Sequence, residues 1–195
     1  MSIKFNNFKK EIIELESNKD FTTQEKKIRE YITAIEENEQ HLSEAYYWLA
    51  RVLYNLDTKA NYNQIVENVE KSIKYCGQVE NEIKVKAYWL LARTYSKIDN
   101  LKESNVLDLY KKCEEYYRQQ GDKSKLLADV LNNIANITKD VDKIKEAIEV
   151  YEKLYDLKEV EKHEVDEVYD SACKIFKYNS MYDDADQYYS KITTI

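Results

Sequence analysis

The feature that most constrains the fold is a motif that returns about every 42 residues. Ala45–Arg51 reads AYYWLAR, and Ala87–Arg93, 42 residues further on, reads AYWLLAR. A third copy begins at Val130, and weaker copies surround Phe5 and Tyr169. Because self-similarity at a period of about 20–50 residues is the signature of repeat architectures, the sequence predicts about five structural repeats.

Each copy places large and small residues at helical spacing. In one copy the large side chains of Tyr46 and Leu53 lie on either side of the small Ala50. This spacing puts the large residues on one helical face, and the small residue lets a neighbouring helix approach to the usual 8–10 Å between axes. We therefore expect the equivalent residues Ala92 and Ala135 to be almost fully buried.

The segments between these copies carry a second set of apolar stripes, for example Ile65, Val69 and Ile73. The chain has no Pro and only two Gly, whereas a β protein needs turn residues every 8–12 positions. The sequence therefore predicts an all-α protein with ten helices. Their expected ranges are 3–17, 22–38, 41–56, 61–76, 79–98, 102–120, 122–140, 142–157, 162–178 and 180–193.

Several residues at the ends of these ranges have the chemistry of helix caps. Thr22–Glu25 has the capping-box pattern, and Ser180–Asp183 resembles it. Gly77 and Gly121 each follow a helical stretch and suit the left-handed position that ends a helix. We expect helices to begin at the first two segments and to end at the two glycines.

The last two hairpins carry a more specific spacing. From Leu131 to Ala147, and from Tyr169 to Ala185, the separation is 16 residues, and a Tyr follows each Ala after four positions. This pattern resembles the tetratricopeptide repeat (TPR) family, most clearly over residues 126–193. The earlier hairpins depart from this spacing, and no copy ends in the family's proline.

The resemblance implies a right-handed α-solenoid of about five antiparallel helical hairpins. It also implies a single TPR-like domain over residues 1–195. An irregular helical bundle is the alternative.

Composition and charge exclude several classes of protein. The formal charge of −7 argues against a nucleic-acid surface, since phosphate binding draws on clustered Lys and Arg. The N-terminal residues lack the apolar stretch of a signal peptide, and no apolar run approaches the roughly 20 residues of a membrane span. Cys76, Cys113 and Cys173 are odd in number and far apart, so we expect buried, reduced thiols in a cytoplasmic protein without membrane contact.

Residues that could perform catalysis are few. Two Gly cannot build a Gly-rich phosphate loop. His41 and His163 lie 122 residues apart in polar stretches without a second ligand at metal-binding spacing, and we expect both to face solvent. The sequence therefore predicts no enzyme, no cofactor and no metal site.

A candidate binding surface follows from the resemblance, because the first helices of successive TPR hairpins line the concave face that solenoids use for binding. Only four of the 30 basic residues are Arg, yet two of them, Arg51 and Arg93, occupy equivalent places in the repeat. The candidate peptide-binding residues on this face are Tyr47, Arg51, Tyr54, Trp89, Arg93, Asn132, Asn136, Lys139 and Lys174.

The chemistry of this surface suits a peptide or helix that bears carboxylates. Arg offers a planar fork of donors, and aromatic rings offer flat contact area. The predicted function is an adaptor or scaffold that binds a protein or peptide along the groove. A structural subunit of a larger complex and a regulatory chaperone are the alternatives. At the level of the residues, the alternative is that Arg51 and Arg93 are solvated or paired with neighbouring Glu.

Overall fold

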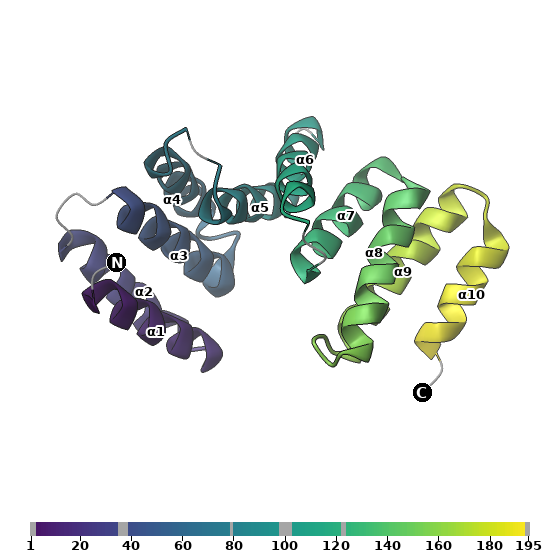
Figure 1. Ribbon diagram of the computed structural model, residues 1–195, viewed down its shortest axis with the longest axis horizontal. Coiled ribbons are helices and arrows are strands. Elements are labelled where there is room, and N and C mark those ends of the chain that lie inside the picture. The colour runs from purple at the N-terminus through teal and green to yellow at the C-terminus, as the bar shows by residue number, and fades with distance from the viewer. Residues whose placement is uncertain (1–2, 35–38, 79, 98–102, 122–123, 194–195) are drawn as a thin grey trace. The chain divides into compact units, whose positions relative to one another are not determined.

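The computed structural model describes residues 3–34, 39–78, 80–97, 103–121 and 124–193 (Figure 1). In these ranges 85% of the residues are helical and none is in a strand, which confirms the all-α prediction. The helices are α1 (Ile3–Ser17), α2 (Phe21–Ala34), α3 (Glu39–Asp57), α4 (Tyr62–Tyr75), α5 (Glu82–Ser96), α6 (Glu103–Gln119), α7 (Lys125–Thr138), α8 (Val141–Asp156), α9 (Lys162–Tyr178) and α10 (Tyr182–Thr193).

The helices form two compact units, Met1–Leu109 and Tyr110–Ile195. In the first unit α1 packs against α2 and α3 against α4, and in the second α7 packs against α8 and α9 against α10. Each of these four pairs forms an antiparallel hairpin (Figure 1). The single domain over residues 1–195 stays a prediction.

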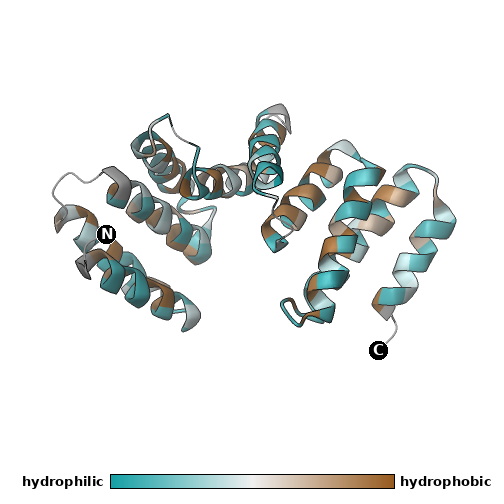
Figure 2. Cartoon of the chain, in the orientation of Figure 1, coloured by the Kyte–Doolittle hydropathy of each residue, from teal (hydrophilic) through white to brown (hydrophobic). Residues whose placement is uncertain are grey.

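The buried residues follow the repeat. Ala50, Ala92 and Ala135, the small positions of three copies, are all 0% exposed, which confirms the predicted register. Around them the helices carry both apolar and polar residues, as expected of amphipathic helices with one face toward the core (Figure 2). No helix in the described part of the chain is both long enough and apolar enough to cross a bilayer.

The TPR-like spacing in the second unit has a clear structural role. Ala147 and Tyr151 are buried in α8, and the Tyr151 hydroxyl donates a hydrogen bond to the Asp129 carboxylate on α7. Ala185 of α10 is likewise buried, but Tyr189, the counterpart of Tyr151, is 57% exposed. The difference arises because α8 packs between α7 and α9, whereas α10 packs mainly against α9.

Left-handed residues end several helices. Gly77 and Gly121 both have φ of 65°, as predicted. Lys19, Lys139, Lys158 and Ser180 also adopt positive φ, near 60°. Lysine and serine therefore take the place that glycine often has at a helix end, at a cost for the Cβ of roughly 1–2 kcal/mol each. This use of other residues is why so few glycines suffice for ten helices.

Both capping-box predictions are wrong. Ser180 ends α9 rather than beginning α10, because its positive φ directs the backbone N–H of Met181 to the carbonyl of Phe176 at 2.8 Å. At the start of α2 the side chain of Asp20 accepts a hydrogen bond from the N–H of Thr23 at 3.2 Å, so the cap lies two residues before Thr22.

The cysteines and histidines depart from expectation at one position each. Cys113 and Cys173 are buried, but Cys76 at the end of α4 is partly exposed, and none of the three forms a disulfide. His163 faces solvent as predicted. His41 is only partly exposed, because its ring stacks on Phe5 with the centroids 3.9 Å apart.

Two partly buried carboxylates of the second unit are held in their ionised form. Burial tends to raise the pKa of Glu114, but hydrogen bonds from Lys143 at 2.7 Å and Arg118 at 2.9 Å lower it below the usual 4.5. Burial likewise opposes ionisation of Glu152, and hydrogen bonds from Lys191 and the Tyr169 hydroxyl, both at 2.7 Å, lower its pKa.

These pKa shifts predict acid sensitivity. A carboxyl whose pKa is depressed by folding contributes stability that is complete above its unfolded value and is lost as the pH falls through its folded value. We therefore expect the urea midpoint, followed by far-UV circular dichroism, to fall steadily below about pH 4.5. Glu114→Gln should be less stable than the parent at neutral pH, and its urea midpoint should fall less steeply as the pH is lowered. If the urea midpoint of this variant fell as steeply as that of the parent, Glu114 would not contribute to the acid sensitivity.

Candidate functional site

The predicted binding residues divide between the two units. Five of them lie on α3 and α5 of the first unit: Tyr47, Arg51, Tyr54, Trp89 and Arg93. Three lie on α7 and α9 of the second unit, and Lys139 directly follows α7: Asn132, Asn136, Lys139 and Lys174. A groove that joins the two sets stays a prediction.

Arg93 is the centre of a cluster of aromatic rings and cations. Its guanidinium carbon lies 4.7 Å from the centroid of the Trp89 ring on α5 and 5.5 Å from that of Tyr54 on α3. The Nζ of Lys97 lies 4.1 Å from the same Tyr54 ring. We refer to Tyr54, Trp89, Arg93 and Lys97 as the Arg93 cluster. Each of its contacts is a cation–π interaction worth roughly 0.5–2 kcal/mol.

Sequence reasoning did not include Lys97 in the site. The signal that could have found it is its spacing, because Trp89, Arg93 and Lys97 follow one another at intervals of four residues. Residues four apart are neighbours on the surface of a helix, so this interval aligns the ring and both cations along one side of α5 and its end.

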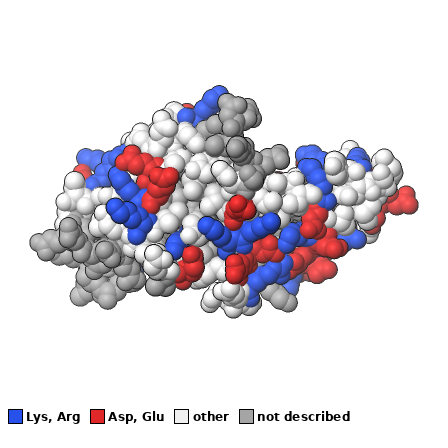
Figure 3. Space-filling view, turned by 90° about the horizontal axis from the view of Figure 1, so that it is seen from above, with Lys and Arg blue, Asp and Glu red and all other residues white. Residues whose placement is uncertain are grey.

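The Arg93 cluster lacks the carboxylates that pair with the other arginines. Arg29 pairs with Glu25, Arg51 with Glu16, and Arg118 with both Glu114 and Glu146, at 2.6–2.9 Å. Among the described residues no carboxylate forms an ion pair with Arg93 or Lys97. On the face shown in Figure 3, Lys and Arg lie next to Asp and Glu. Arg93 therefore differs from the other three arginines, all of which pair with a carboxylate in the described part of the chain.

Two neutral donors in the cluster also lack acceptors. The Tyr54 hydroxyl and the Trp89 indole N–H are shielded from solvent, and neither has a hydrogen-bond partner in the described ranges. Leaving a buried donor unpaired costs about 1–3 kcal/mol. Lys97 does have one acceptor, the Thr58 hydroxyl at 3.3 Å. The cluster is thus rich in donors and poor in acceptors.

Arg51 differs from Arg93 although the two are equivalent in the repeat. It lies over the Trp48 ring, 5.1 Å from the centroid, and its Nε is 2.8 Å from the carboxylate of Glu16 on α1. The alternative that these arginines pair with neighbouring Glu therefore describes Arg51.

Tyr47 does not present an accessible surface, which corrects the prediction for this residue. It is only 4% exposed and belongs to the core of the first unit. The reason is that α3 packs against α2, α4 and α5, which leaves little of its surface open. Burial raises the pKa of Tyr47, and the adjacent Arg51 opposes this rise.

The residues of the second unit form a polar row. The Asn136 side-chain amide donates to the Asn132 side chain at 3.1 Å and to the Ser171 hydroxyl on α9 at 3.3 Å. Lys139 is the left-handed residue that ends α7, and its Nζ donates to the Asn136 carbonyl at 2.5 Å. Lys174 is exposed and pairs with Asp170 on its own helix. The structure thus connects Asn132, Asn136 and Lys139 but leaves Lys174 apart from them.

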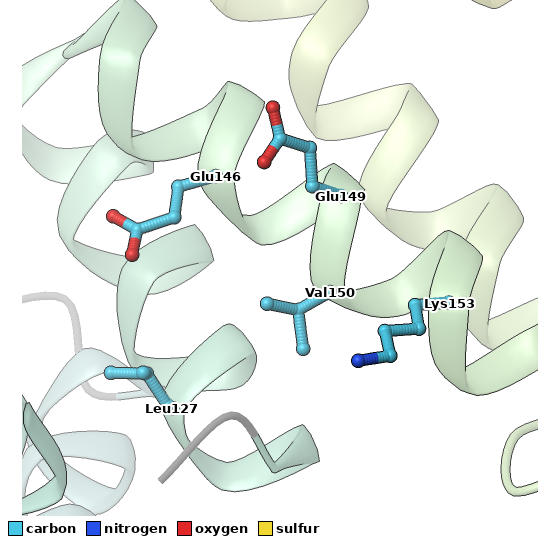
Figure 4. A pocket seen from close by; sticks show the side chains of 5 residues that line it. All are labelled: Leu127, Glu146, Glu149, Val150 and Lys153. Carbon is cyan, nitrogen blue, oxygen red and sulfur yellow. The ribbon is translucent and has the colours of Figure 1, made fainter. Parts of the chain in front are cut away.

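Two shallow pockets lie away from these residues. One of about 170 Å³ in the second unit is lined by Leu127 of α7 and by Glu146, Glu149, Val150 and Lys153 of α8 (Figure 4). Its apolar floor has a rim of mixed charge, so it favours no particular ligand. The other, of about 270 Å³ in the first unit, is lined by residues of α2, α3 and α4: Arg29, Ile32, Thr33, Tyr46, Leu49, Gln64, Glu67, Asn68 and Lys71. Its cations Arg29 and Lys71 already bond to Gln64 and Glu67.

Comparison with known proteins identifies the fold. No family model and no curated protein matches the sequence. Several solved structures do match in three dimensions. BtubC (BKLC) from P. vanneervenii has a TM-score of 0.75 and 16% identity, over 91% of this chain and 74% of that one.

Two further structures match over almost the whole chain. A putative kinesin light chain with nearly identical TPR-like repeats from Podosopora anserina has a TM-score of 0.66 and 11% identity, over 97% of this chain and 93% of that one. MamA has a TM-score of 0.57 and 17% identity, over 98% and 93% respectively. Together with the paired helices and the buried small residues, these similarities show that the chain has the TPR-like helical-repeat fold.

Proposed function

We propose that this chain is a protein-binding scaffold whose Arg93 cluster holds an acidic segment of a partner protein. The TPR-like fold is a general scaffold for protein interaction and typically serves binding rather than catalysis. The observation that carries the proposal is that Arg93, alone among the four arginines, has no carboxylate partner among the described residues.

The geometry of the cluster favours an anion. Contacts with the Trp89 and Tyr54 rings hold the Arg93 guanidinium in place, so that binding costs little side-chain entropy. A carboxylate can accept two parallel hydrogen bonds from such a guanidinium, and charge-assisted bonds are roughly twice as strong as neutral ones. Trp, Tyr and Arg are also the residues that most often dominate the energy of protein interfaces.

The polar row of the second unit is a further candidate for contact with a peptide. Asn132 and Asn136 are partly exposed, and amide side chains can donate to and accept from the backbone of an extended peptide. We propose that Asn132, Asn136 and Lys174 form a binding surface of the second unit in its own right. We place the protein in the cytoplasm, because three cysteines without a disulfide suit a reducing compartment.

Reversing the charge of Arg93 tests the proposal. Three degenerate peptide libraries of equal length, rich in Glu, in Gln or in Lys, are titrated against the protein by fluorescence anisotropy. We expect the Glu-rich library to bind best and Arg93→Glu to weaken its binding at least tenfold, equivalent to about 1.4 kcal/mol. Arg93 is a better choice than Arg51, since a Glu at position 51 would face Glu16.

A matched control distinguishes loss of the binding site from the effect of a changed net charge. Lys111 is exposed on α6, so Lys111→Glu makes the same change of charge elsewhere and should leave binding unaltered. Lys111→Glu should keep the parent's melting temperature, because exposed substitutions usually cost within about 0.5 kcal/mol. Arg93→Glu loses two cation–π contacts worth roughly 0.5–2 kcal/mol each, so its melting temperature should fall, and far-UV circular dichroism at the assay temperature checks that this variant is folded. Equal affinity of the Arg93→Glu variant and the parent for the Glu-rich library would refute the proposal.

A further inference from the structure

Two cations that pair with no carboxylate of the described residues share one aromatic ring in the Arg93 cluster. Arg93 and Lys97 lie 5.5 and 4.1 Å from the centroid of the Tyr54 ring, and they are four residues apart in the chain. Like charges at this spacing destabilise a helix by about 0.2–0.5 kcal/mol. Elsewhere in the first unit the same spacing joins opposite charges, as in Glu67–Lys71 and Glu82–Lys86. A ligand with a single negative charge would neutralise only one of these two positive charges.

The donors of the cluster also exceed what one carboxylate can accept. The Arg93 guanidinium has five N–H groups, and the Lys97 ammonium has three, one of which is directed to Thr58. The Tyr54 hydroxyl and the Trp89 N–H also lack acceptors among the described residues, but both atoms are shielded from solvent. The donors that a ligand can reach are therefore those of the partly exposed Arg93 and the exposed Lys97. A carboxylate brings two oxygens and one charge. A phosphorylated side chain brings three acceptor oxygens and a charge of about −1.5 to −2.

We propose that the Arg93 cluster recognises a phosphorylated serine or threonine in the partner protein. This inference rests on the proposed function and specifies its ligand. The phosphate would accept hydrogen bonds from Arg93 and Lys97, and its charge would neutralise both cations. Because Trp89 and Tyr54 already hold Arg93 by stacking, the site is largely organised before the ligand arrives.

The surroundings of the cluster favour a single phosphate over a polymer of phosphates. Nucleic acids and anionic membranes bind to stripes of many cations. In the first unit the other cations are largely paired with acids: Lys9 with Glu44, Lys27 with Glu11, Arg51 with Glu16, Lys71 with Glu67, Lys84 with Glu80 and Lys86 with Glu82. A phosphate chain would face these carboxylates, whereas one phosphate on a peptide need not.

Three peptide libraries that differ only at a fixed central residue test the inference. The central residue is phosphoserine, glutamate or serine, and each library is titrated by fluorescence anisotropy at neutral pH. We expect the phosphoserine library to bind at least tenfold more tightly than the glutamate library. Lys97→Gln should reduce this preference to about threefold or less, while the matched Lys111→Gln should leave it unchanged.

The pH dependence provides an independent readout. Because the second pKa of a phosphate monoester is about 6, the affinity for the phosphoserine library should fall between pH 7 and pH 5. Glutamate stays ionised over this range, so binding of its library should not change.

Three outcomes would overturn the inference. Equal affinity for phosphoserine and glutamate libraries would leave the proposed function standing with a carboxylate as its ligand. If neither library bound, both proposals would fail. Tighter Arg93-dependent binding of a single-stranded RNA oligonucleotide, or of phosphatidylserine vesicles, would assign the phosphate to a different class of partner.

Discussion

Leu131→Ala is expected to destabilise the protein by about 2–5 kcal/mol, the range for a large-to-small change at a fully buried site. Leu131 is 0% exposed on α7, where it belongs to the third copy of the repeat. The change removes buried methyl groups and leaves a cavity, because the packed helices relax only in part. Urea unfolding followed by far-UV circular dichroism measures the loss.

The same substitution at an exposed leucine serves as the control. Leu157 follows α8 and is 58% exposed, so Leu157→Ala should change the free energy of unfolding by less than about 0.5 kcal/mol. Similar losses in the two variants would mean that Leu131 does not lie in a packed core.

Ala92→Leu is expected to destabilise the first unit by about 1–3 kcal/mol through overpacking. Ala92 is 0% exposed on α5, at the position where the repeat requires a small residue. Three added carbons cannot fit there unless the neighbouring helix shifts or side chains leave their preferred rotamers. Both tryptophans, Trp48 and Trp89, lie in this unit, so urea unfolding followed by tryptophan fluorescence reports on it directly.

An exposed helical alanine provides the matched control. Ala34 at the end of α2 is exposed, and Ala34→Leu should be neutral within about 0.5 kcal/mol because leucine is also a good helix former. An Ala92→Leu variant as stable as the parent would show that the repeat register is wrong.

Most of the helices could be predicted from the sequence because their signals are local. The helices predicted at 3–17 and 162–178 have the observed bounds, and most other predicted ends lie within three residues of the observed ones. Apolar residues at intervals of three and four report directly on which face of a helix is buried. The 42-residue period then identified Ala50, Ala92 and Ala135 as contact positions without any knowledge of their neighbours.

The residues that cap the helices were predicted less well from the sequence. Ser180 has the residue type of an N-terminal cap but serves as the left-handed end of α9. Residue type alone cannot separate these roles, because serine is suited to the first and tolerated in the second when the flanking helices impose a positive φ.

The candidate site shows what only the tertiary structure decided. The sequence by itself determined that Arg51 and Arg93 occupy equivalent positions on successive first helices. It could not determine their partners, because these come from a different helix in each case. Arg51 meets Glu16 of α1, whereas Arg93 meets the ring of Tyr54 on α3. One arginine is therefore neutralised and the other has no carboxylate partner among the described residues, since periodicity sets the direction of a side chain but the neighbouring helix supplies its contacts.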